Sequence, residues 1–117
     1  MGLDMFFICV PKGQEPSEEN WKAFAQFRKH SDLHGWLEKQ WHDTLGKSER
    51  FNCVFMEITP DILSRLKDYL KNPVKKKYRG FFWGESTEED WKETRELVPR
   101  LEEIINSGDR VFYYSWW

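Results

Sequence analysis

The sequence predicts a small α+β domain, in which a mainly antiparallel sheet of about four strands carries about three helices on one face. Short apolar runs alternate along the chain with longer stretches whose apolar residues recur at helical spacing. The strands are few, and none is followed by a glycine-rich phosphate loop. The length of 117 residues fits a single domain, and we expect residues 1–117 to share one core.

The first two predicted elements lie near the start of the chain. Residues 3–10, LDMFFICV, are apolar on both faces, which is typical of a strand covered on both sides. A polar segment with proline and glycine follows over residues 11–20. Residues 21–29, WKAFAQFRK, fit either a helix capped by Ser17 or a strand, since helical and alternating spacings can both be drawn through them. Periodicity alone leaves both alternatives open.

A helix and a strand are predicted in the middle of the chain. Ser31 can cap a helix over residues 32–43, which should end near Gly46. The side chains of this helix that should face the core are Leu33, Trp36, Leu37 and Trp41. Residues 51–58, FNCVFMEI, indicate a second core strand.

Thr59 followed by Pro60 is a typical helix start, an N-cap with proline at the first helical position. The helix predicted from there, over residues 61–72, has one apolar stripe. That stripe consists of Ile62, Leu63, Leu66, Tyr69 and Leu70.

A long helix and a final strand complete the prediction. Ser86 or Thr87 should cap a helix that starts at Glu88, because the acidic residues of its first turn suit the helix dipole. Its apolar stripe consists of Trp91, Val98, Leu101, Ile104 and Ile105. Pro99 falls inside this stripe and should kink the helix or divide it in two. Residues 110–117 are predicted to form the last strand.

Composition and charge exclude several classes of protein. The net charge of −2 gives no overall attraction to nucleic acid or anionic membranes. No run of ~18 apolar residues could span a bilayer. The first ten residues carry Asp4 and lack the basic start of a signal peptide, so we expect a cytoplasmic protein without membrane contact. The seven tryptophans can supply much of the core.

The two cysteines and the paired histidines are predicted to be structural. Cys9 and Cys53 lie in apolar runs, so we expect free, reduced thiols that are largely buried in strands. His30 and His34 stand four residues apart, which would suit a metal on one helix. Ser31 should start the helix between them, however, and no third ligand is evident. The favoured interpretation is one surface and one half-buried histidine, with no metal or cofactor.

Five segments of the chain occur in a distinctive order. They are MGLDMFF at 1–7, FRKHSDLHGWLEKQW at 27–41, NCVFMEIT at 52–59, GFFWGES at 80–86 and YYSWW at 113–117. Together they span nearly the whole chain and resemble a family of short phage and prophage proteins of unknown function that open Met-Gly-Leu-Asp-Met. The resemblance implies a phage-type accessory protein in the host cytoplasm and brings no established activity. It also implies that AFAQFRKH is a strand leading into the helix, which favours the strand alternative for residues 21–29.

The candidate binding surface is the basic and aromatic stretch before the long helix. A run of basic residues precedes the rings of residues 81–83, which stand between two glycines. Three consecutive side chains cannot all point into one core, so at least one ring should be exposed. The alternative is a solvated loop followed by core aromatics. The predicted binding residues are Lys77, Arg79, Phe81, Phe82, Trp83 and Glu85.

A second candidate is a polar pocket formed by Asp4, Arg28 and His34. Asp4 lies inside the first strand and Arg28 at the end of the second, so a bidentate pair between carboxylate and guanidinium is plausible. Such pairs are usually architectural, but perturbed polar groups also occur at functional sites.

Small size, an excess of aromatic residues and the lack of a catalytic constellation favour a binding function. The leading hypothesis is a phage- or prophage-type accessory protein that binds a host or phage macromolecule, with a protein as the favoured partner. One alternative is a module for single-stranded nucleic acid, because cations beside stacking rings suit that ligand. A further and less favoured alternative is a small enzyme that uses Asp4, Arg28 and His34. The identity of the partner and the oligomeric state stay open.

The aromatic stretch gives a prediction that separates binding from folding. Phe82→Ala should leave the melting temperature nearly unchanged and abolish partner binding, if Phe82 is the exposed ring of an extended segment. Trp83→Ala should cost about 3–5 kcal/mol of the free energy of unfolding, as the loss of a large core ring usually does. Thermal melts of both variants test this. Unfolding of both would show that the stretch belongs to the core.

Overall fold

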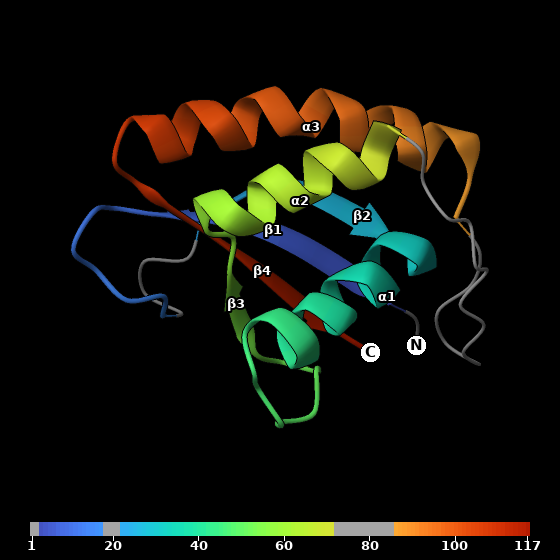
Figure 1. The fold of residues 1–117 in the computed structure, drawn as a ribbon, viewed down its shortest axis with the longest axis horizontal. Helices are drawn as coiled ribbons and strands as arrows, with labels where there is room; N and C mark the ends of the chain where they lie inside the picture. The colour runs from blue at the N-terminus through green and yellow to red at the C-terminus, as the bar shows by residue number, and fades with distance from the viewer. Residues whose placement is uncertain (1–2, 18–21, 72–85) are drawn as a thin grey trace.

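The computed structural model describes residues 3–17, 22–71 and 86–117 (Figure 1). The predicted α+β fold is confirmed: four strands form one sheet, and three α-helices pack with it. In chain order the elements are β1 (Asp4–Val10), β2 (Lys22–Arg28), α1 (Ser31–Lys39), the π-helix η1 (Gln40–Thr44), β3 (Phe55–Glu57), α2 (Pro60–Lys71), α3 (Glu88–Asn106) and β4 (Arg110–Trp116). The predicted binding residues Lys77, Arg79, Phe81, Phe82, Trp83 and Glu85 lie outside the described residues.

The sheet has the strand order β2-β1-β4-β3, and all of its neighbours pair antiparallel. The first and last strands of the chain, β1 and β4, form the centre and pair along their whole length, with Phe7 opposite Tyr113. Figure 1 shows α1 and α2 lying across one face of the sheet, with α3 running alongside them. The strand predicted over residues 3–10 is confirmed as β1, and its central position gives it a partner strand on each edge, whereas the helices cover one of its two faces.

The main core lies between the sheet and the helices. Phe7 and Tyr113 point into it from the central strands, and both are fully buried. The helices contribute the apolar stripes that their sequences predict, since Ile62 and Leu101 are also fully buried. Leu97 and Thr94 of α3 are buried as well, although the predicted stripe did not include them. The spacing of apolar residues thus predicted which side of each helix faces the core, but the predicted stripe of α3 left out one apolar and one polar residue that are buried there.

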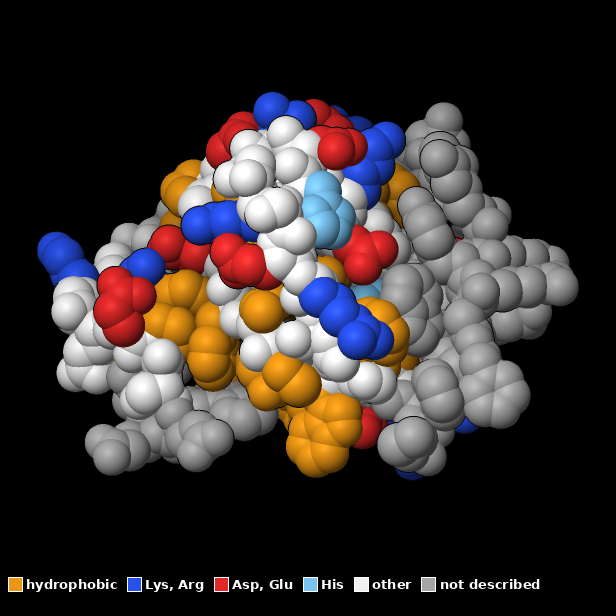
Figure 2. All heavy atoms as spheres, turned by 90° about the horizontal axis from the view of Figure 1, so that it is seen from below, with side chains coloured by type: hydrophobic (Ala, Val, Ile, Leu, Met, Phe, Trp, Pro, Cys, Tyr) orange, Lys and Arg blue, Asp and Glu red, His pale blue; other side chains and the backbone are white. Residues whose placement is uncertain are grey.

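The face of the sheet that points away from the helices is also rich in aromatic side chains. Phe6, Tyr114 and Phe55 form a row across three strands, because Tyr114 is opposite both of the others. All three are half-buried, and Trp116 nearby is 58% exposed. The view from below shows a group of hydrophobic side chains in the lower centre of the picture, with charged side chains above and beside it (Figure 2). Apolar character on both faces explains why the central strands do not alternate in sequence.

Helix boundaries follow the predicted capping residues in α2 and α3. Thr59 caps α2 by accepting the backbone N–H of Ile62. Thr87 caps α3 in a capping box, in which its hydroxyl accepts from the N–H of Asp90 and its own N–H donates to the Asp90 carboxylate. The predicted cap of α1 is wrong. His30 occupies the N-cap position, and Ser31 is the first residue inside the helix.

Pro99 does not divide α3, which is one helix of 19 residues. Proline removes the N–H that would bond to the carbonyl of Arg95. Both Pro99 and Arg95 are exposed, so water can bond to the freed carbonyl. The proline is tolerated because it falls on the solvent side of the helix.

Two predictions for the middle of the chain need correction. The strand expected over residues 51–58 is only the three-residue β3, since the chain bends at residues 51–53. Cys53 lies in that bend with a left-handed φ of 58°. Its side chain is exposed, so the prediction of two buried cysteines in strands is wrong for this residue. Cys9 is half-buried in β1, and both thiols are free as expected.

The different surroundings of the thiols predict different reactivity. Burial and the charge of Asp109 raise the pKa of Cys9, whereas Cys53 is exposed, so a thiol reagent should modify Cys53 first. Stopped-flow titration at neutral pH should show a fast and a slow phase, and denaturant should merge them. Cys53→Ser should remove only the fast phase. Loss of the slow phase in that variant would contradict the assignment.

Candidate functional site

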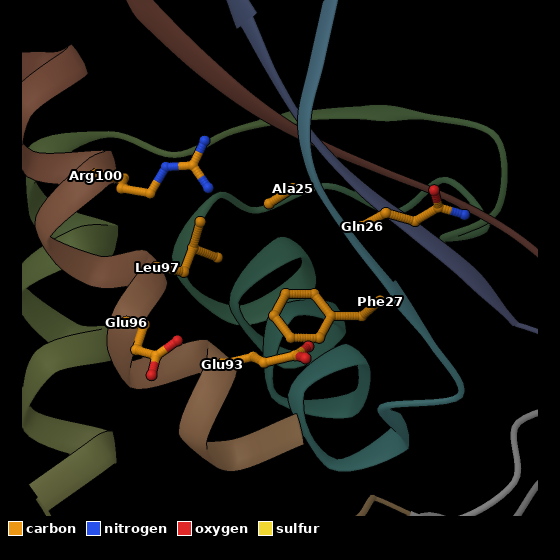
Figure 3. A pocket seen from close by; sticks show the side chains of 7 residues that line it. All are labelled: Ala25, Gln26, Phe27, Glu93, Glu96, Leu97 and Arg100. Carbon is orange, nitrogen blue, oxygen red and sulfur yellow. The ribbon is translucent and has the colours of Figure 1, made fainter. Parts of the chain in front are cut away.

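A cleft of about 280 Å³ lies between the outer strand β2 and helix α3 (Figure 3). Its lining consists of Ala25, Gln26, Phe27, Glu93, Glu96, Leu97 and Arg100. The helix runs antiparallel to the neighbouring strand, because Arg100 lies level with Ala25 at one end and Glu93 level with Phe27 at the other. The candidate functional site is this cleft together with the edge of the strand beside it.

The outer edge of β2 offers backbone groups for hydrogen bonding. Lys29 donates its backbone N–H to Leu3 across the β1–β2 pair at 2.9 Å. In an antiparallel pair, residues alternate between bonding to the partner strand and pointing away from it. The register then turns the backbone of Phe27 toward β1 and the backbones of Gln26 and Arg28 outward. Among the described residues no strand pairs with this outer edge, because β2 ends the sheet.

The two ends of the cleft carry opposite charge. The carboxylate of Glu93 lies beneath the ring of Phe27, and the guanidinium of Arg100 reaches toward β2 at the other end. Arg100 also lies over the ring of Phe24, with 5.2 Å between the guanidinium carbon and the ring centroid. Within the described part of the chain, neither Glu93 nor Arg100 forms an ion pair. Both are exposed, so their charges are available to a ligand.

The floor of the cleft is apolar and rests on a buried histidine. Phe27 is 4% exposed, and its ring centroid lies 5.5 Å from that of His30. His30 packs edge-on against Trp91, with 4.7 Å between ring centroids. Phe27 belongs to β2 and Trp91 to α3. His30 therefore packs between the strand and the helix that form the two walls of the cleft.

His30 is also the centre of a chain of hydrogen bonds. The hydroxyl of Thr94 donates to the backbone carbonyl of Asp90 at 2.7 Å, so its oxygen accepts from His30 Nε2–H at 3.0 Å. Nδ1 of the neutral ring is then an acceptor and receives the hydroxyl of Ser86 at 2.7 Å. Ser86 in turn accepts the backbone N–H of Asp32 at 2.9 Å. Each donor in this chain has an acceptor, which fixes the tautomer of the imidazole.

Ser86 caps a helix that is remote in sequence. Its oxygen accepts an N–H in the first turn of α1, which is the role that Ser31 was predicted to fill. Ser31 Oγ is buried and has no hydrogen-bond partner among the described residues. Ser86 and Thr87, predicted as alternative caps of one helix, therefore cap two different helices.

The contacts of Ser86 and His30 do not suit nucleophilic catalysis. Burial lowers the pKa of His30 to about 4, against a smaller opposing effect of the charge of Asp90. A general base at neutral pH works best with a pKa near 7 and gains from a carboxylate on its second nitrogen, whereas His30 has Thr94 there. The arrangement instead joins the start of α1 to the first turns of α3.

The predicted polar pocket is formed only in part. Arg28 and Asp4 pair across β2 and β1, with 3.6 Å between Nε and Oδ1, so the contact is a single ion pair rather than a bidentate one. The side chain of Arg28 is 73% exposed. His34 lies in the main core, where Nδ1 is hydrogen-bonded to the Tyr113 hydroxyl at 2.7 Å. Both predicted histidines are fully buried, which corrects the expectation of a surface and a half-buried pair.

In two other hollows, several of the charged side chains already have partners. In the groove between α2 and α3, Lys67 pairs with Glu102 at 2.8 Å and Lys71 with Asp68 at 3.4 Å. Beside β3, the cations Lys47 and Arg110 lie over two of the aromatic rings that line the hollow. Arg95 in that groove and Glu49 in the hollow beside β3 form no ion pair within the described part of the chain, so the feature that distinguishes the cleft at β2 is the strand edge beside it.

Sequence reasoning missed the residues that line this cleft. Glu93, Glu96 and Arg100 stand in a helix face that is charged throughout, so their types and spacing do not distinguish them from other solvated side chains. The only sequence signal was the ambiguity of residues 21–29, which is typical of an edge strand with one exposed side.

No protein-family model, curated protein or solved structure matches the chain. Across the described ranges, no three His, Cys, Asp or Glu side chains are arranged to hold a metal ion. No helix in the part of the chain that the structure describes is long and apolar enough to cross a membrane.

The buried imidazole predicts a pH-dependent stability. The folded pKa of His30 is about 4 and the ordinary value is 6.5, so below pH 6.5 the unfolded chain takes up a proton that the folded chain does not. The free energy of unfolding should therefore fall by about 3 kcal/mol from this residue alone as the pH drops from 6.5 to 4. His34, whose pKa burial lowers to about 3, should add to the loss.

Urea unfolding of the wild type, His30→Gln and His42→Gln at several pH values measures how the free energy of unfolding depends on pH. His30→Gln should be less stable at neutral pH and should lose a large part of the pH dependence. The matched control is His42→Gln, because His42 is exposed and the variant should keep the full dependence. A folded-state NMR titration of His30 with a midpoint above pH 6 would contradict the assignment.

Proposed function

We propose that this protein is a binding module that captures an extended segment of another protein along the free edge of β2. The observation that carries the proposal is the outward-pointing backbone of Gln26 and Arg28 beside a cleft with an apolar floor. An added strand would gain main-chain hydrogen bonds from the edge and place alternate side chains in the cleft. The cleft has a volume of about 280 Å³, which is enough for a few such side chains.

The charges of the cleft favour a peptide over a nucleic acid. Two carboxylates, Glu93 and Glu96, stand on its helical wall and would repel phosphates. Arg100 at the opposite end gives the cleft a charge of each sign, which a peptide with side chains of both signs can match. The alternative of single-stranded nucleic acid depends on the stretch before Ser86, which lies outside the described residues.

The resemblance to short phage and prophage proteins supports a more specific form of the proposal. In that form the captured segment belongs to a host or phage protein, and the module works in the host cytoplasm as an accessory factor. The support is the order of five sequence segments, from MGLDMFF at the start to YYSWW at the end.

Peptide selection tests the proposed function. Random nine-residue peptides displayed on phage are selected on the immobilised protein and then measured one by one. Gln26→Pro should weaken the selected peptides about tenfold, because proline removes one outward N–H at the edge. That N–H is not used in the pairing with β1, so the variant should keep its fold.

Gln26→Val is the matched control, since valine changes the same side chain and keeps the N–H. The selected peptides should bind Gln26→Val about tenfold more tightly than they bind Gln26→Pro, because both variants lose the glutamine side chain and only proline removes the N–H. Failure to select any peptide, or peptides that bind wild type and Gln26→Pro equally, would show that the edge of β2 is not the binding site.

A further inference from the structure

We propose that, in the absence of another partner, a second copy of this chain occupies the free edge of β2. The two β2 strands pair antiparallel about a two-fold axis beside Gln26, so that two four-stranded sheets become one continuous sheet. This inference rests on the proposed function, because both use the same edge. When no other protein is bound, the edge of β2 pairs with the β2 strand of the second copy.

The charges of Glu93 and Arg100, at the two ends of the cleft, are complementary to each other about a two-fold axis. The strand and the helix run in opposite directions, with Glu93 level with Phe27 and Arg100 level with Ala25 (Figure 3). A two-fold axis beside Gln26 exchanges the two ends. It brings the second copy's Arg100 to the end where Glu93 stands, and the second copy's Glu93 to the end where Arg100 stands. An isologous contact of this kind contains each ion pair twice.

The backbone register of β2 supports the same axis. Gln26 points its N–H and C=O outward, so at the axis it can exchange two hydrogen bonds with the second copy's Gln26. Arg28 then lies opposite the second copy's Phe24 rather than opposite a like charge. Phe24 falls at the irregularity where the register of β1 and β2 shifts, and this irregularity limits the length of the pairing.

The side chains that would form the contact between the two copies are exposed in the single chain. Gln26, Glu93 and Arg100 are all exposed, and no described residue forms an ion pair with either charge. Edge strands with unpaired backbone groups readily pair with one another. A short pairing with two ion pairs makes a dimer that a longer matching strand of another protein can displace.

Charge reversal tests the two-fold pairing. Sedimentation velocity over a range of concentrations gives the dissociation constant of the dimer. Glu93→Arg and Arg100→Glu should each raise it about tenfold, equivalent to ~1.4 kcal/mol, because each places like charges together at both ends. The double variant Glu93→Arg/Arg100→Glu should return to the wild-type constant, since the swap restores both ion pairs.

Glu103→Arg is the matched control, because Glu103 is exposed on the same helix and does not line the cleft. This variant should dimerise as the wild type does, and Gln26→Pro should be monomeric. A monomeric wild type at all concentrations, or a double variant as weak as the single ones, would overturn the inference.

The same variants separate this inference from the proposed function. Peptides that bind the wild type and lose affinity with Gln26→Pro, in a protein that is always monomeric, would overturn the dimer alone. A dimer that shows the charge-swap rescue while no peptide can be selected would support the dimer and overturn the capture of other proteins.

Discussion

The neutral imidazole of His30 holds together parts of the chain that are far apart in sequence. Its two nitrogens bond to Ser86 and Thr94, which are 56 and 64 residues away. Ser86 in turn caps α1, and Thr94 bonds to the first turns of α3. A buried polar group is costly unless each of its hydrogen-bonding atoms has a partner. The complete chain of donors and acceptors therefore makes the position of α3 relative to α1 depend on one ring.

The candidate site depends on the same ring through packing. His30 contacts Phe27 on the strand side and Trp91 on the helix side, and Phe27 is part of the floor of the cleft. The carboxylate of Glu93 then faces β2 because α3 is anchored at the next residue, Thr94. A buried, packed apolar floor with charged ends lies beside a strand edge without a partner strand, and these are the features on which the proposed capture of an extended chain rests.

The remaining polar contacts of the fold act elsewhere. Arg110 forms two hydrogen bonds with Glu57 and one with the backbone of Gln14, which ties β4 to β3 and to the segment after β1. His34 lies in the main core and is hydrogen-bonded to the Tyr113 hydroxyl. These contacts stabilise the sheet and its connections. None of them uses the outer edge of β2, which, like the outer edge of β3 at the other end of the sheet, has no partner strand among the described residues.

The sequence by itself determined the local structure. The Thr59-Pro60 start of α2, the acidic start of α3 and the apolar runs of β1 and β4 depend on neighbouring residues, so the α+β class and most boundaries could be predicted. Only the tertiary structure decided which serine caps α1, that Cys53 is exposed, and that Glu93 and Arg100 stand at opposite ends of a cleft. The cap of α1, the exposure of Cys53 and the position of the two charges all result from contacts between segments that are distant in sequence. Such contacts cannot be predicted from the types and spacing of neighbouring residues.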